Sequence, residues 1–163
     1  MTDGSTDILV LGLGNLLLSD DGLGLRLLRD LASEGSAVEF LDGGTQGLAL
    51  LSYLSNRRAL IILDAVALGA PPGTVHVLQG ETISAHHAVT AHGSNALELL
   101  AAARLLGDLP PSVTIIGIEP ACIRTGIGLS PAVEAAIPEA LSRARTVLES
   151  TIREVAKAPL LDG

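Results

Sequence analysis

The stretch ILVLGLGNLLLSDDGLG, residues 8–24, decides the fold, because it joins a buried strand to a glycine turn and a helix. Its first part is a short, continuous apolar run that ends at glycine, as expected of a strand covered on both faces. Leucines at helical spacing then predict a helix from Asp21 to about Ser33. Ser19 or Asp20 is available as its N-cap and Gly35 as its terminator.

Apolar runs on the C-terminal side of this stretch predict the rest of the fold. Strands are predicted at 37–44, 59–65 and 112–119, an edge strand of open direction at 74–79, and helices at 46–56 and 94–107. Strands and helices that alternate at this spacing are typical of right-handed parallel crossovers. We therefore predict an α/β fold, a doubly wound and mostly parallel sheet of about five strands with helices on both faces. A last helix should begin at Ser130, with Pro131 in its first turn, and Pro138 should kink or break it.

Length and composition predict one aliphatic domain. The 163 residues fit a single domain over 1–163, in which 1–6 and 157–163 are expected to be loose. Apolar residues make up 48% of the chain but aromatic residues only 1%, and Phe40 and Tyr53 are the only rings. A base-stacking surface for single-stranded nucleic acid is therefore excluded.

The charge balance narrows the choice of partners. Eighteen acidic and ten basic residues give a formal charge of −8, which repels phosphates, so no nucleic-acid partner is expected. No apolar run approaches the roughly 18 residues of a membrane span, and the polar start MTDGSTD does not resemble a signal peptide. Together with the single Cys122, these features predict a cytoplasmic protein that does not enter a membrane. We expect a monomer.

Polar side chains follow the predicted strands. In an open parallel sheet, ligands bind beyond the carboxyl ends of the strands. The residues that these strand ends present are Asn15, Asp20, Asp21, Asp42, Thr45, Gln46, Asp64 and Glu119. His92 precedes the helix that leads into strand 112–119, so it should lie at the same edge. No lysine occurs at these strand ends, and carboxylates with an imidazole suit a borderline divalent cation such as nickel or zinc.

These residues also admit other interpretations. A dinucleotide site is disfavoured because Leu17 stands where the third glycine of the fingerprint would be, and no GK[ST] follows for a P-loop. Asp20 or Asp21 could be an ordinary N-cap. Asp64 is harder to explain in this way, because burying an unpaired carboxylate costs several kcal/mol.

The remaining candidates carry weaker signals. His86 and His87 are adjacent in a predicted loop and are interpreted as solvated, with a substrate contact as the alternative; His76, in the edge strand, is given no role. A thiol nucleophile at Cys122 was considered, but His92 is the only evident base nearby and is already needed for the metal. No GxSxG elbow for a serine nucleophile is present.

Five segments in order carry a family resemblance, which runs from Ile8 to about Ser150. They are GLGNLLLSDDGLG at 12–24, LDGGTQG at 41–47, LIILDAV at 60–66, HG at 92–93 and IGIEPACIRTGIGLSPAV at 116–133. The chain closely resembles the maturation endopeptidases of nickel–iron hydrogenases, which trim a C-terminal extension from the large subunit after nickel insertion. The family fold is a sheet with helices on both faces, in agreement with the fold predicted above.

The resemblance implies roles for particular residues. The metal-contacting acids fall on Asp21 and Asp64, and the imidazole falls on His92; the family commonly has Glu at the first position, so Asp21 shortens the reach by about one methylene. Positioning of the substrate falls on the turn Asp42, Gly43, Gly44, Thr45 and Gln46.

The implied substrate is the hydrogenase large-subunit precursor, and the nickel is carried by that substrate. Cleavage then waits for correct metal loading, and both a metal-polarised carbonyl and an activated water are compatible with the residue set. Two alternatives use the same crevice: a non-catalytic chaperone that checks nickel, and a small-molecule or nucleotide-binding module. A cleavage assay on the nickel-loaded precursor separates them, because only a protease shortens it.

Overall fold

Five strands of the described residues form one sheet, and each grows from one of the apolar runs. The computed structural model describes residues 6–32, 38–83 and 95–157. The strands are β1 (Ile8–Leu13), β2 (Val38–Gly44), β3 (Ala59–Ala65), β4 (Val75–Gln79) and β5 (Ser112–Ile118). Every residue of β1 and β3 is buried, which explains why their sequences are apolar without alternation.

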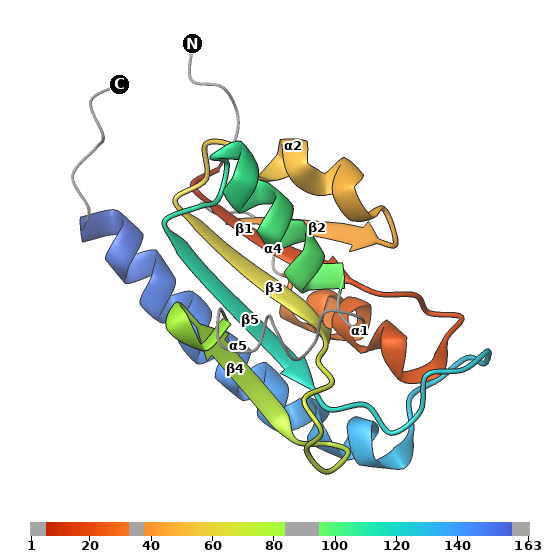
Figure 1. The fold of residues 1–163 in the computed structure, drawn as a ribbon. Coiled ribbons are helices and arrows are strands. Elements are labelled where there is room, and N and C mark those ends of the chain that lie inside the picture. Colours follow the sequence, from red (N-terminus) through yellow and green to blue (C-terminus); the bar gives the residue numbers. More distant parts are fainter. Residues whose placement is uncertain (1–5, 33–37, 84–94, 158–163) are drawn as a thin grey trace.

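The order of the strands across the sheet is β2-β1-β3-β5-β4. Neighbours among β2, β1, β3 and β5 pair in parallel, whereas β4 pairs antiparallel with β5 at the edge (Figure 1). The predicted doubly wound, mostly parallel sheet is confirmed. The pairing also gives the direction of strand 74–79, which the sequence had left open.

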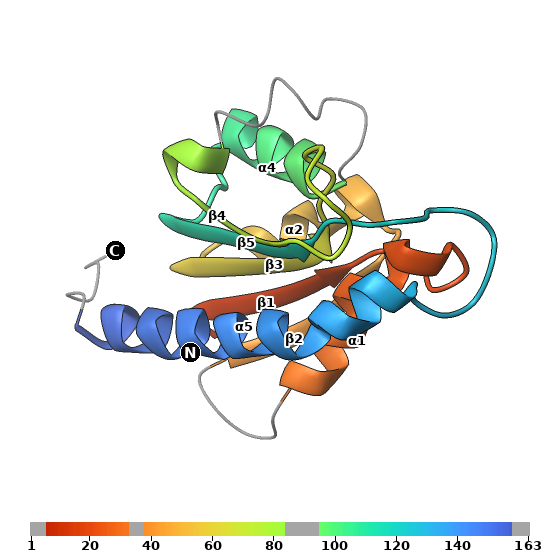
Figure 2. The ribbon, with the colours of Figure 1, turned by 90° about the horizontal axis from the view of Figure 1, so that it is seen from below.

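Helices cover both faces of the sheet. Helices α1 (Leu23–Leu31) and α5 (Pro131–Lys157) pack on one face, and α2 (Leu51–Leu54) and α4 (Asn95–Leu106) pack on the other (Figure 2). Each face has its own aliphatic core. Within the described residues, no helix is both long and apolar enough to cross a bilayer.

The first helix is shorter than predicted. Residues Ser19–Gly22 form a 3₁₀ turn, η1, and α1 begins only at Leu23. Neither Ser19 nor Asp20 caps it, because the Ser19 hydroxyl donates to the carbonyl of Arg124 and the Asp20 carboxylate is used elsewhere. The predicted terminator Gly35 lies outside the described residues. The predicted helix 46–56 forms as a 3₁₀ turn, η2 (Gly47–Leu50), that leads into α2.

Two predictions near the C-terminus have different outcomes. Gly107 ends α4 as expected, in a left-handed conformation with φ 75°. Pro138 does not break α5, which continues to Lys157. Pro138 and Glu134 both lie on the exposed side of the helix, so water can solvate the Glu134 carbonyl that lacks a donor.

Thr6 and Lys157 are the two described residues within the segments that were predicted to be loose. Thr6 is held in place, because its carbonyl accepts a hydrogen bond of 2.6 Å from Nη1 of Arg57. Lys157 is the last residue of α5. The rest of both predicted segments lies outside the described residues.

Candidate active site

The carboxyl ends of the parallel strands meet at one edge of the sheet, as the sequence predicted. The β1 turn is tied to the β2 turn by a 3.0 Å hydrogen bond from the Gly14 amide to the Gly44 carbonyl. Asp64 lies near the end of β3, where it pairs in register with Gly117 of β5. The edge therefore brings together the loop after β1, the turn after β2 and the Asp64 carboxyl.

Two glycines let the loop after β1 fold tightly against this edge. At Gly14, φ is 133° and a Cβ would lie 1.9 Å from the carbonyl oxygen of Asp21. At Gly24, a Cβ would lie 2.3 Å from the carbonyl oxygen of Leu63, so α1 starts in backbone contact with β3. Only glycine fits at either position. The prediction that these glycines shape the turn is confirmed.

Asp20 holds the edge together. Its side chain is fully buried and accepts four hydrogen bonds from a distant loop. The donors are the amides of Ala121, Cys122 and Ser130 at 2.7–3.0 Å and the Ser130 hydroxyl at 2.8 Å. Burial raises the pKa of Asp20, but the bonds from Ser130, Ala121 and Cys122 outweigh burial, so the pKa lies below its usual value. Asp20 is therefore an ionised structural anchor.

Asp21 and Asp64 form a pair of acids at the same edge. One oxygen of Asp21 accepts a 2.9 Å hydrogen bond from the Asn15 amide, and its side chain is half-buried. Asp64 is buried, and its bonds come from the amides of Ala65 and Ala96. Burial raises the pKa of Asp64 well above its usual range, and the negative charge of Asp21 raises it further, against the lowering effect of the two amides. A cation bound here would relieve both effects.

The third predicted member, His92, lies outside the described residues, as do His86 and His87. The described residues alone contain no group of three His, Cys, Asp or Glu side chains able to hold a metal ion. Ala96, in the first turn of α4, bonds Asp64, so α4 begins beside the acid pair. His92 is only four residues before Ala96 in the sequence.

The turn 42–46 lies at the end of β2, at the same edge of the sheet as the acid pair. The Asp42 carboxylate accepts a 2.9 Å hydrogen bond from the Gly44 amide, and the Gln46 amide donates to the Gly43 carbonyl. These bonds fix the backbone, while the side chains of Asp42, Thr45 and Gln46 remain exposed. Exposed polar groups on a fixed turn are suited to contact a substrate.

Glu119 and His76 form a contact that the sequence did not predict, and Cys122 lies near the same edge. Glu119 does not join the acid pair, because its carboxylate accepts bonds from the amides of Leu68 and Gly69 and contacts Nε2 of His76 at 2.8 Å. His76, which was given no role, is thus a partner of a buried carboxylate. Cys122 is half-buried, and its sulfur accepts a 2.8 Å hydrogen bond from Nε of Arg124.

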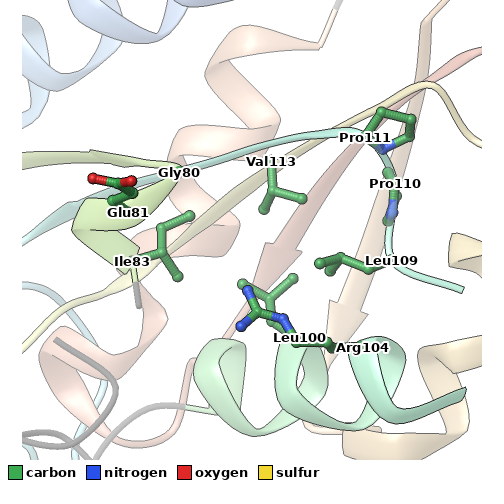
Figure 3. Close-up of a pocket in the computed structure, with 9 residues that line it drawn as sticks. All are labelled: Gly80, Glu81, Ile83, Leu100, Arg104, Leu109, Pro110, Pro111 and Val113. Atoms are coloured by element: carbon green, nitrogen blue, oxygen red, sulfur yellow. The ribbon is translucent and has the colours of Figure 1, made fainter. Parts of the chain in front are cut away.

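Two pockets lie at opposite edges of the sheet. One of about 590 Å³ lies between α1, the end of β2 and the residues before α5, and Asp42 and Ser19 are among its lining residues. The other, of about 350 Å³, lies at the start of β5, where Leu100, Leu109 and Val113 point into it (Figure 3). The acid pair lies at the edge that holds the first pocket.

Comparisons with known proteins agree with this arrangement. The model of the family HycI: Hydrogenase maturation protease matches residues 25–147. The chain is 37% identical to Hydrogenase 2 maturation protease of Escherichia coli (strain K12), over 95% of this chain and 99% of that protein. It is 36% identical to the hydrogenase expression/formation protein HupD of Rhodobacter capsulatus, over 96% of this chain and 78% of that protein.

Solved structures show the same fold. The hydrogenase maturating endopeptidase HybD from E. coli superposes with a TM-score of 0.80 at 37% identity, covering 90% of this chain and 94% of that one. The [NiFe] hydrogenase maturation protease HybD from Thermococcus kodakarensis gives 0.69 at 28% identity, covering 87% and 99%. The chain therefore belongs to the hydrogenase maturation proteases, a family of endopeptidases.

Proposed function

We propose that this endopeptidase removes a C-terminal extension from a hydrogenase large-subunit precursor, and that it recognises nickel inserted in that precursor through Asp21, Asp64 and His92. The family membership supports a hydrogenase protein as the substrate. The acid pair at the sheet edge supports a cation as the recognised feature.

The observation that carries the proposal is the state of Asp64. A buried carboxylate beside a second carboxylate is unfavourable in the free protein, and two amide bonds do not remove that cost. A divalent ion offered by the substrate supplies the missing positive charge, and an imidazole nitrogen would complete a mixed oxygen and nitrogen ligand set suited to nickel. Binding is then favoured only when the precursor carries its metal.

The chain's other residues prepare this contact. Asp20 fixes the loop that carries Asp21, and the tight turn at Gly14 fixes the direction from which Asp21 approaches. The exposed polar side chains of the turn 42–46, at the same edge of the sheet, support a role in holding the polypeptide next to the metal. Asp42 through Gln46 are thus proposed as substrate-positioning residues.

A processing assay tests the proposal. We expect Asp21→Ala, Asp64→Ala and His92→Ala each to lower the rate at which nickel-loaded precursor is shortened by at least about 10–100-fold, the loss that follows when even the hydrogen-bond partners of metal ligands are removed. Asp21→Glu should be the mildest change, because it keeps the charge. Asp108→Ala, an acid at the opposite edge, is the matched control and should process normally.

The outcomes separate this function from its alternatives. If any of the three variants processes at the wild-type rate, that residue is not part of the site. If the wild-type protein binds the loaded precursor but never shortens it, a nickel-checking chaperone replaces the protease. Equal processing of loaded and nickel-free precursor would show that the metal is not what the site recognises.

A further inference from the structure

Two loops that are far apart in sequence form a ridge beside the acid pair. We define the loop ridge as residues 14–19 and 122–128. Figure 1 and Figure 2 both show these loops side by side, beyond the end of the sheet. Leu18 and Gly126 form a bridge, in which the Ser19 amide bonds the Gly126 carbonyl and the Gly126 amide bonds the Leu17 carbonyl, both at 2.9 Å. The ridge is therefore a fixed feature of the fold.

The loop ridge exposes apolar side chains. Nine large apolar side chains are exposed among the described residues, and four of them lie on these two short loops: Leu16, Leu17, Ile123 and Ile127. Exposed apolar residues that gather in this way mark interaction sites, whereas scattered ones do not. At the foot of the ridge, Leu16 and Ile127 also line the pocket of about 590 Å³.

The charge of the loop ridge indicates which kind of partner surface can bind it. In a chain of net charge −8, the only charged residue on the ridge is Arg124. At the pocket, Arg26 contacts Asp30 and Glu134 at 3.0 Å, so these three charges are paired with one another. A matching surface is therefore apolar and not basic.

We propose that the loop ridge docks an apolar patch on the folded body of the hydrogenase large-subunit precursor, and that one aliphatic side chain of the precursor enters the adjacent pocket. This inference rests on the proposed function. The ridge runs directly into Asp20 and Asp21, so a substrate that reaches the acid pair lies against it. A second copy of this chain seated on the ridge would instead cover the acid pair that the reaction needs open.

The test uses Ile127→Asp and Leu17→Asp, with Leu105→Asp as the control. Ile127 and Leu105 are both 88% exposed, but Leu105 lies on α4 near the opposite edge. The half-saturating concentration of nickel-loaded precursor should rise about tenfold or more in both ridge variants, as at a central interface residue. The maximal rate should stay within about twofold, and the control should match the wild type in both quantities. Circular dichroism verifies folding, and Ile127→Ser replaces any variant that fails to fold.

Several results would overturn the docking role. An unchanged half-saturating concentration in both folded ridge variants would do so, as would an equal rise in the control. A wild-type dimer in sedimentation velocity that Ile127→Asp converts to monomer would assign the ridge to a second copy. Precursor binding is measured separately from cleavage: if the wild type binds without cleaving and Ile127→Asp weakens binding, the protease proposal fails while the docking proposal stands.

Discussion

Asp20 and Asp64 are two buried carboxylates at the same sheet edge, and their surroundings differ in one respect. Asp20 accepts four hydrogen bonds from residues of the chain that hold its charge. Among the described residues, Asp64 receives amide bonds from Ala65 and Ala96, and it faces the negative charge of Asp21. The pKa of Asp20 lies below its usual value, although burial alone would raise it. The pKa of Asp64 lies above its usual value because that carboxyl is buried.

The difference distinguishes a structural carboxylate from the candidate functional carboxylates at this edge. A carboxylate whose acceptor sites are filled by its own chain has no capacity left for a ligand, so Asp20 stabilises the fold. A carboxylate that is buried beside a second negative charge is kept at a cost, and such costs are concentrated at functional sites. Asp21 and Asp64 are therefore the acids that we propose a substrate cation stabilises.

The largest expected effect is on stability, from Asp20→Ala. Removing this buried carboxylate leaves three amides and a hydroxyl without their acceptor, so we expect the free energy of unfolding to fall by about 3–5 kcal/mol. Urea denaturation at neutral pH measures it. Asp30→Ala, which removes a partly exposed ion pair, should cost no more than about 1 kcal/mol. Equal losses in both variants would mean that Asp20 is not an anchor.

Asp64→Asn should change the free energy of unfolding in the opposite direction to Asp20→Ala. The amide keeps the shape but removes the buried negative charge, so we expect the free energy of unfolding at pH 7 to rise by about 1–3 kcal/mol, the scale of an incompletely satisfied buried polar group. The same variant should lose precursor processing. Urea denaturation and the processing assay on one protein sample test both parts. A variant less stable than wild type would show that Asp64 contributes to the fold as Asp20 does.

The pH dependence sharpens this comparison. Because the pKa of Asp64 is raised in the folded state, the cost of its charge appears as pH rises above the unfolded value of about 3.9. The stability gained by Asp64→Asn should therefore shrink as pH falls from 7 towards 4. The pKa of Asp20 is lowered, so its stabilisation persists above about 3.9 and disappears only as pH falls below that value. Urea midpoints at pH 4, 5.5 and 7 measure how Asp64→Asn and Asp20→Ala each change stability relative to wild type. If the two changes follow the same trend with pH, the assignment is contradicted.

The smallest expected effect is that of Cys122→Ser. The backbone amide of Cys122, not its thiol, bonds Asp20, and the substitution keeps that amide. We expect processing within about twofold of wild type and a stability change within about 0.5 kcal/mol, as for other substitutions that leave such networks intact. A covalent thioester trapped on Cys122 would instead make it a nucleophile.

The fold was predictable because its signals are local. Residues 8–13 and 59–65 are apolar throughout, and such runs alternating with helical spacing are enough to predict a parallel sheet. The direction of β4 depends on its pairing with β5, which local sequence does not encode. The sequence alone could not show that α5 continues past Pro138, because this depends on which side of α5 faces solvent.

The site was only partly predictable for the same reason. The sequence placed Asp21 and Asp64 at one edge, since strand ends define that edge. Strand ends alone did not distinguish Asp20 from Asp21, which only the family resemblance separated, because the donors that occupy Asp20 lie at residues 121–130. The pairing of Glu119 with His76 was missed because it depends on the antiparallel register of β4.

The Asp20 anchor also sets an order of events during synthesis. Its partners are 101 to 110 residues further along the chain, and the ribosome adds about 5–20 residues per second. A nascent chain that has emerged only as far as β3 contains Asp21 and Asp64 but not the loop that fixes Asp20. The acid pair is therefore completed only after Ser130 has left the ribosome. The nascent enzyme has no assembled site until most of its chain has been synthesised.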